Sequence, residues 1–180
     1  MLAHRFGGLS TGNCNLCGGT LHHLLTTEPI PQHIGISHME RLELVACLSC
    51  VGWEAQTLFY QHDVDGVPRD ITPGSHAVVP TFSAGPLQEI GVGLAELGSR
   101  WPPSGAVGEN PHRLGGAPAW IQAPEYPRCP ACYRQSQFLL QLDGGLRTQA
   151  GESWEWGGSG RAFVFWCDHC RISSILWQDS

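Results

Sequence analysis

The chain has 180 residues, the length of one domain or of two closely packed small ones. Charged residues make up only 14% of it, while 23 glycines and 13 prolines favour turns over helices. The net charge of −6, with the ten basic residues all arginine and nowhere clustered, disfavours nucleic-acid binding. No apolar run could span a bilayer and the first residues lack the apolar stretch of a secretory signal, so we expect a cytoplasmic, non-membrane protein.

Six runs rich in leucine, valine and aromatic residues have the length of β-strands. They cover residues 20–27, 41–47, 54–61, 135–142, 161–167 and 172–178. Residues 62 to about 120 are polar and punctuated by glycine and proline, which predicts a connector. Within it Leu87, Ile90, Leu94 and Leu97 have roughly helical spacing, but intervening glycines weaken a helix there. We expect a mainly β fold, α+β at most.

The cysteines carry the strongest chemical pattern. All eight fall in four CxxC pairs: Cys14 and Cys17, Cys47 and Cys50, Cys129 and Cys132, Cys167 and Cys170. Four thiolates from two such pairs satisfy the tetrahedral preference of Zn²⁺, and a reducing cytoplasm opposes disulfides. The loops between consecutive pairs exceed those of a minimal zinc ribbon, so each loop must hold further structure. We therefore predict two structural Zn(II) ions, one held by each half of the chain.

Three other uses of CxxC pairs are weighed against zinc. A thioredoxin-type redox pair needs one thiol at a helix N-terminus, and four copies exceed that need. Disulfides would require a secreted protein, and iron–sulfur ligation usually follows a different spacing. Four pairs can share two metals in three ways, and only the resemblance between the halves favours pairing within each half.

The two halves of the chain resemble one another. Each has two leucines after its first CxxC pair and an arginine six residues before its third cysteine: Leu24, Leu25, Leu139, Leu140, Arg41 and Arg161. This pattern predicts an internal duplication. We expect zinc-clipped halves at residues 1–70 and 100–180, joined by a connector at 71–99 and packed as one unit. Each half would be an antiparallel hairpin or sheet with a zinc-ribbon-like site.

From His112 to Gln178 the order HRLGGAPAWIQ, YPRCPACYRQSQFLLQL, WEWGGSGRAFVFWCDHC and LWQ resembles the YwqG-like family of uncharacterised bacterial proteins. That family is itself similar to the domain of programmed cell death protein 2. The resemblance implies a β-rich, duplicated fold and no established activity, although the eukaryotic relatives are linked to chaperoning a ribosomal protein. It carries over these motif residues besides the cysteines: Gly115, Gly116, Trp120, Gln122, Gln141, Gly157, Gly160 and Gln178.

Aromatic residues suggest a contact surface. Seven tryptophans are many for this length, and most should fill the core of a small β protein. Trp154 and Trp156 alternate with glutamates beside a glycine-rich turn. Of the seven they are the best candidates for partial exposure and, with Trp120 and Gln122, for a contact surface, although plain packing is the interpretation we favour for them.

Catalysis is not needed to explain the presence of any residue in the sequence. Zinc with four thiolate ligands has no open position for water, so it contributes to folding. We predict a zinc-stabilised module that binds an unidentified protein partner, as an adaptor or chaperone-like protein. One alternative is an enzyme, a hydrolase or modification enzyme, with its site in the cleft between the halves. Another is a nucleic-acid-binding zinc ribbon, which the negative charge opposes.

Overall fold

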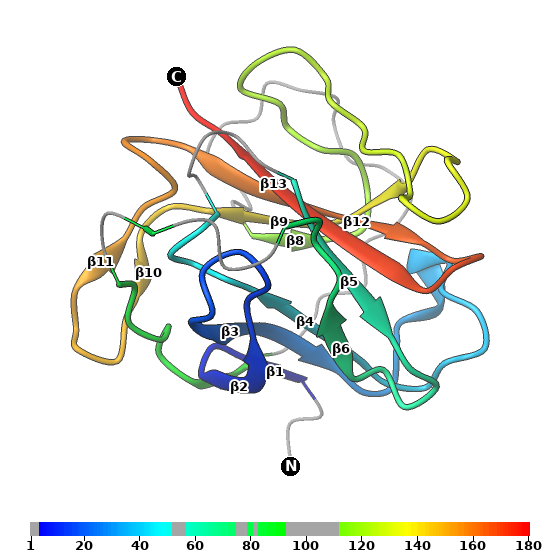
Figure 1. Cartoon of the computed structure of the whole chain (residues 1–180), viewed down its shortest axis with the longest axis horizontal. Helices are drawn as coiled ribbons and strands as arrows, with labels where there is room; N and C mark the ends of the chain where they lie inside the picture. Colours follow the sequence, from blue (N-terminus) through cyan, green and yellow to red (C-terminus); the bar gives the residue numbers. More distant parts are fainter. Residues whose placement is uncertain (1–3, 52–56, 75–78, 81–82, 93–111) are drawn as a thin grey trace.

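The computed structural model describes residues 4–51, 57–74, 79–80, 83–92 and 112–180. These form two antiparallel sheets and a short hairpin (Figure 1). The mainly β prediction is confirmed, because the described residues contain β-strands and one 3₁₀ turn, η1 (Gln32–Ile34), but no α-helix. Accordingly, none of the described segments is a helix long and apolar enough to cross a membrane.

The first sheet has five strands and is centred on β3. One side of β3 pairs with both β2 and β1, the other side pairs with β4, and β7 extends the sheet beyond β1. The bounds are β1 (His4–Phe6), β2 (Leu9–Asn13), β3 (Thr20–Thr27), β4 (Leu42–Ala46) and β7 (Ile90–Val92). Strand β7 lies in the stretch of helical spacing; Leu94 and Leu97 lie outside the described residues. At Ile90–Val92 the chain pairs with β1 as a strand instead of forming the helix that the spacing suggested, and Gly91 at its centre is a poor helix former.

The second sheet has six strands and mixes distant parts of the chain. Its order is β6-β5-β13-β12-β9-β8. The bounds are β5 (Leu58–His62), β6 (Pro68–Asp70), β8 (Arg113–Leu114), β9 (Gln137–Asp143), β12 (Arg161–Cys167) and β13 (Ile172–Gln178), beside a separate hairpin of β10 (Leu146–Arg147) and β11 (Ser153–Trp154). Strand β5 pairs with β13, with Leu58 opposite Ile175. The first part of the chain therefore supplies two strands to the sheet of the last part, while the predicted division at 70 and 100 stays a prediction.

The start of the expected connector is a hairpin rather than a loop. Strands β5 and β6 pair around a turn in which the Asp63 carboxylate accepts hydrogen bonds from Asp65 N and Val67 N, at 3.0 and 2.9 Å. His62 is 1% exposed. The polar composition marks the turn correctly, but the turn is only five residues long, and the chain returns at once to the sheet.

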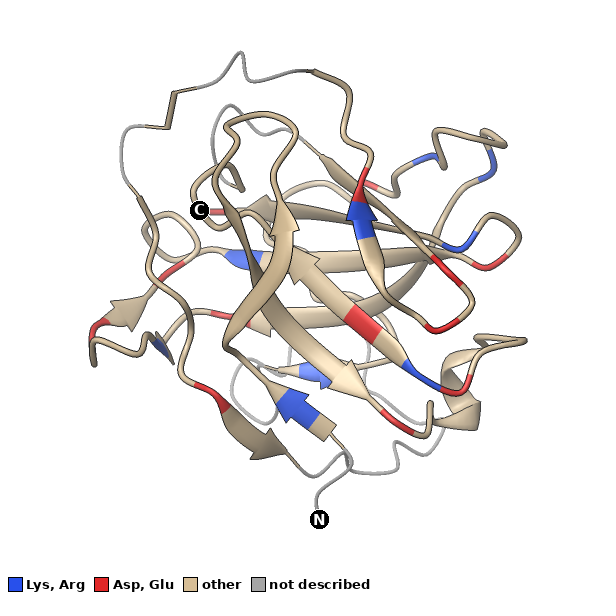
Figure 2. Ribbon diagram, turned by 60° about the horizontal axis from the view of Figure 1, so that its bottom comes forward, with Lys and Arg blue, Asp and Glu red and all other residues tan. Residues whose placement is uncertain are grey.

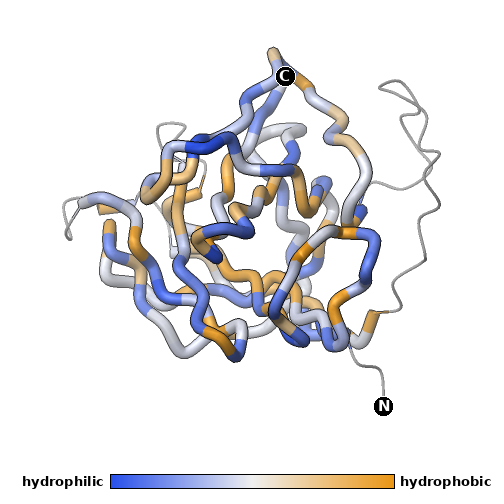
Figure 3. Tube along the Cα trace, turned by 90° about the vertical axis from the view of Figure 1, so that its right-hand side faces the viewer, coloured by the Kyte–Doolittle hydropathy of each residue, from blue (hydrophilic) through white to orange (hydrophobic). Residues whose placement is uncertain are grey.

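Strand β12 shows why its sequence is apolar throughout. Ala162, Val164 and Trp166 belong to the core shared by the two sheets, whereas Phe163 and Phe165 belong to a cluster on the other face. Because successive side chains point to opposite faces, a strand covered on both sides needs apolar residues at every position. Figure 3 shows hydrophobic stretches of the chain around the centre of the molecule.

The internal duplication reaches further than the cysteines. The segment HRFGG at residues 4–8 matches HRLGG at residues 112–116. In each, the first glycine is left-handed, with φ of 77° at Gly7 and 78° at Gly115. Its N–H donates to the first leucine of the pair on the neighbouring strand, Gly7 to Leu24 O at 3.1 Å and Gly115 to Leu139 O at 2.7 Å. The two repeats therefore enter their sheets through the same glycine turn.

Candidate metal centres

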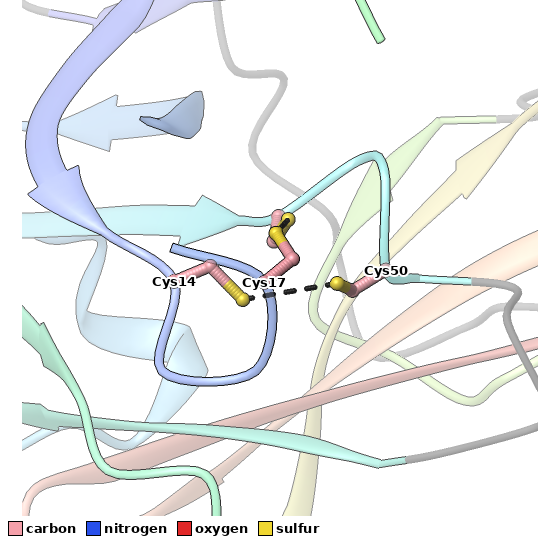
Figure 4. A group of neighbouring side chains, drawn as sticks. Cys14, Cys17 and Cys50 are labelled. Atoms are coloured by element: carbon pink, nitrogen blue, oxygen red, sulfur yellow. Dashed lines mark hydrogen bonds between the residues drawn. The ribbon is translucent and has the colours of Figure 1, made fainter. Parts of the chain in front are cut away.

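The first centre gathers four cysteines from two turns. Cys14 and Cys17 lie in the turn between β2 and β3, and Cys47 and Cys50 lie in the turn that follows β4. Their sulfur atoms all lie within 4.8 Å of one another. The Sγ atoms of Cys14 and Cys50 are 3.8 Å apart (Figure 4). Those of Cys17 and Cys47 are 3.6 Å apart.

The second centre lies at one end of the six-stranded sheet. Cys129 and Cys132 precede β9, while Cys167 and Cys170 form the turn between β12 and β13. The four sulfur atoms again lie within 4.8 Å of one another, with 3.6 Å between Cys132 and Cys167. The four CxxC pairs could form two groups in three ways. The structure groups the two pairs of each repeat together.

These distances fit a shared metal ion and exclude disulfides. Four sulfurs at about 2.3 Å from one ion at the corners of a tetrahedron are about 3.8 Å from one another. A disulfide would bring two sulfurs to about 2.05 Å. All eight cysteines are free. Each group could therefore hold a metal ion without rearrangement of its turns.

Backbone geometry explains why CxxC turns place sulfur atoms this way. In the first turn, Leu16 N lies 3.3 Å from Cys14 Sγ and Gly19 N lies 3.4 Å from Cys17 Sγ, so two N–H groups donate to sulfur. Such donors stabilise the negative charge of thiolates around an ion. The residue that follows a CxxC pair adopts the left-handed backbone conformation at Gly18, with φ of 73°, and at Tyr133, with φ of 60°.

The first centre also joins the two sheets. Cys47 N donates to the hydroxyl of Tyr60 on β5, at 3.1 Å. Asn15, inside the first CxxC, donates its N–H to the carboxylate of Asp70 on β6, at 2.9 Å. Both partners belong to the six-stranded sheet, whereas the cysteines come from the five-stranded one. Holding these turns in place therefore also fixes how the edges of the two sheets meet.

The electrostatics of both groups favour a bound cation. Interaction with the neighbouring Cys47 thiol lowers the pKa of Cys14 to about 6, and interaction with Cys14 raises the pKa of the Cys47 thiol. In the second group burial raises the pKa of Cys167 to about 11 and that of Cys170 to about 12. Four thiolates so close together repel one another, so only a positive ion makes their joint deprotonation favourable.

The structure also locates the four residues of the expected contact surface. Trp156 is buried, 2% exposed, and its Nε1 donates to Asp143 O at 3.1 Å, so it packs in the core. Trp154 is half-buried against it, with ring centroids 5.6 Å apart. Trp120 is half-buried and Gln122 is exposed. Their contact with a partner stays a prediction.

Two buried glutamines explain how the segment around Trp120 is held. Gln141 Oε1 accepts the N–H of Ala119 at 2.9 Å. Gln178 Oε1 accepts the N–H groups of Ile121 and Gln122, at 3.2 and 3.1 Å, and its Nε2 donates to Ala123 O at 2.9 Å. The segment thus lies across the outer face of the six-stranded sheet. Gln141 and Gln178 are both motif residues of the family resemblance, and these hydrogen bonds give them a structural role.

Comparison with known proteins gives one similarity. The chain is 26% identical over 175 residues to a protein of Salmonella typhimurium described as uncharacterized protein YpfL. The match covers 93% of this chain and 39% of that protein, so the chain spans about two fifths of the relative's length. No family model and no solved structure matches the chain. The chain is thus similar to an uncharacterised bacterial protein, and the YwqG-like resemblance stays a prediction.

Proposed function

We propose that each four-cysteine group binds one Zn²⁺ as a structural ion. The observation that carries the proposal is the distance between the sulfur atoms of neighbouring cysteines, 3.6 to 3.8 Å. This distance matches the edge of a tetrahedral four-thiolate site. Zn²⁺ is the common metal for four cysteines from two CxxC turns. Such an ion contributes folding energy, on the order of 10 kcal/mol apparent per site, and leaves no position for a substrate.

Metal stoichiometry tests this proposal directly. Native mass spectrometry of protein purified without chelator should give two zinc ions per chain, with eight thiols that react after denaturation in chelator. Cys129→Ser should retain one zinc, while His169→Ala, the control inside the other metal-binding turn of the same centre, should retain two. Absence of metal together with oxidised cysteines would refute the proposal.

We further propose that the zinc-stabilised fold serves to bind a protein partner in the cytoplasm, as an adaptor or chaperone-like module. Free thiols at metal-binding distances suit a reducing compartment. The contact surface that we favour is the segment around Trp120 and Gln122. There the Trp120 ring stacks on Phe165, with centroids 5.9 Å apart, and meets Tyr126 edge-on at 5.3 Å. Tyr126 is 40% exposed, and such half-exposed aromatic clusters are enriched at protein interfaces.

The distribution of charge supports a protein partner over a nucleic acid. Figure 2 shows arginines on separate strands and loops of the described chain rather than gathered in one area. Arg5, Arg41 and Arg161 form ion pairs with acidic side chains of the chain itself. Nucleic-acid binding depends on a concentrated positive surface.

Site-specific crosslinking separates this contact surface from the rest of the molecule. A photoreactive phenylalanine at position 126 should capture a defined protein in host cells, and the matched replacement of Tyr133, another exposed tyrosine, should not. Gln122→Glu, which adds charge to the same segment, should reduce the yield. Equal capture at both positions, or a crosslink to nucleic acid, would contradict the proposed surface.

A further inference from the structure

A carboxylate inside the second centre reaches across to the first repeat. Asp168 lies between Cys167 and Cys170. Its Oδ1 accepts the N–H of Ser37 at 3.0 Å and its Oδ2 accepts the Ser37 hydroxyl at 2.5 Å. The indole N–H of Trp166 also donates to Oδ1, at 3.1 Å. Charge-assisted bonds of this kind are about twice as strong as neutral ones.

Ser37 lies in the loop that joins β3 to β4, and the part of the loop around it is called the loop tip below. The base of this loop is closed by Ile30 N, which donates to Glu40 O at 3.0 Å. Ile34 is buried in the core, 7% exposed. Beyond these anchors the backbone turns at Gly35, with φ of 68°. Asp168 therefore fastens the end of a loop whose base is already fixed.

The loop forms a wall of two grooves, one on each side of Ser37. One groove, of about 690 Å³, runs between residues 33–35 of the loop and the segments 115–118 and 135–138. The other, also about 690 Å³, lies between residues 38–41 and the turn at 64–65. A shift of the loop tip would change the shape of both grooves at once.

The second centre is the more accessible of the two. In the first centre Cys14, Cys47 and Cys50 are each 1% exposed, and of its four cysteines Cys17 alone is partly exposed. In the second, Cys132 and Cys170 are partly exposed. A chelator or a metal-accepting protein therefore reaches the second centre first, since ligand exchange at a zinc site begins with access to a thiolate.

We propose that Asp168 couples the metal content of the second centre to the position of the loop tip at Ser37. This inference rests on the proposed function, because it requires that the second group binds zinc. While Cys167 and Cys170 share an ion, their turn is fixed and Asp168 holds Ser37. When the ion passes to a chelator the thiolates take up protons, the turn loosens, and Asp168 releases the tip that shapes both grooves.

Amide hydrogen exchange of the full zinc-loaded chain tests the coupling, because the Ser37 N–H is itself one of the bonded groups. Asp168→Ala should retain two zinc ions, and its Ser37 amide should exchange about tenfold faster or more, as expected on loss of a charge-assisted hydrogen bond. His169→Ala, the neighbouring exposed residue, should leave the rate unchanged. Ser37→Ala, which keeps the amide and loses the hydroxyl bond, should give a smaller increase and serves if Asp168→Ala does not fold.

Removing metal completes the test. Cys132→Ser should lower the stoichiometry to one zinc and raise Ser37 exchange as much as Asp168→Ala does, while exchange in β3 stays slow. An unchanged Ser37 rate in Asp168→Ala, or in Cys132→Ser with one zinc lost, would overturn the coupling and leave the zinc proposal intact. A wild-type chain that binds no zinc would instead overturn the proposed function.

Discussion

Gln178 offers a sharp test of how the outer segment is held. It is 3% exposed and makes three hydrogen bonds to the backbone of residues 121–123. Gln178→Leu keeps the approximate volume of the side chain and removes all three bonds. The free peptide groups lie in a half-exposed or exposed turn, so water replaces part of the loss. At a net 0.5 to 1.5 kcal/mol per bond, the expected destabilisation is about 2 to 4 kcal/mol.

Urea denaturation at a fixed concentration of free zinc would measure this change, because metal that binds only the folded state contributes to apparent stability. In a chain of this size the thermal midpoint should fall by roughly 5 to 15 °C. Two zinc ions should remain, since Gln178 contacts neither centre.

Gln122→Leu is the matched control. Gln122 is exposed and its Nε2 makes one hydrogen bond, to Asp179 O at 2.9 Å, so its replacement should change stability by less than about 1 kcal/mol. A Gln178→Leu variant as stable as the wild type to within about 0.5 kcal/mol would refute the argument, as would an equal loss in both variants.

Three further substitutions test the fold at other points. Burial lowers the pKa of His62 from 6.5 to about 4, so between these pH values the unfolded chain binds a proton that the folded chain does not. The free energy of unfolding, measured by urea denaturation, should therefore fall as the pH is lowered from 6.5 to 4, by about 3 kcal/mol at pH 4. His62→Leu should remove this part of the slope, and His169→Leu should keep it. Gly160→Ala would place Cβ 2.0 Å from Trp156 O, so its thermal midpoint should fall markedly, whereas Gly158→Ala, with open space around it, should melt like the wild type. Trp156→Ala should cost about 3 to 5 kcal/mol by calorimetry, clearly more than Trp154→Ala, and equal losses would contradict the burial difference.

Much of the strand arrangement follows from local sequence. Four runs of apolar residues, 20–27, 41–47, 161–167 and 172–178, coincide with β3, β4, β12 and β13 to within one residue. Each run is rich in leucine, valine, isoleucine or aromatic residues at strand length, which distinguishes it from the polar turns around it. The sequence left three ways to pair the cysteines, and the resemblance between the halves favoured pairing within each repeat. In the structure β3 pairs with β4, which brings the two CxxC turns of the first repeat together.

What could not be predicted depends on contacts between distant residues. The partner of β5 is β13, more than a hundred residues away, and no local pattern specifies that choice. Trp156 alternates with glutamates as an exposed strand would, but its bridge to Gly160 folds it into the core. The bond between Asp168 and Ser37 has no sequence signal either. By contrast, the repeated HRxGG segment was readable in the sequence and would have extended the duplication to its first strand.

The pairing of β5 with β13 bears on how such a chain could have arisen. If LFYQ at residues 58–61 is aligned with ILWQ at 175–178, Leu58 and Ile175 are equivalent positions. These two residues stand opposite each other in the antiparallel pair. Two separate copies of one repeat would make the same contact across a two-fold axis through that position. A single polypeptide that holds both copies forms this sheet at any concentration, whereas an ancestral dimer would have depended on encounter between chains.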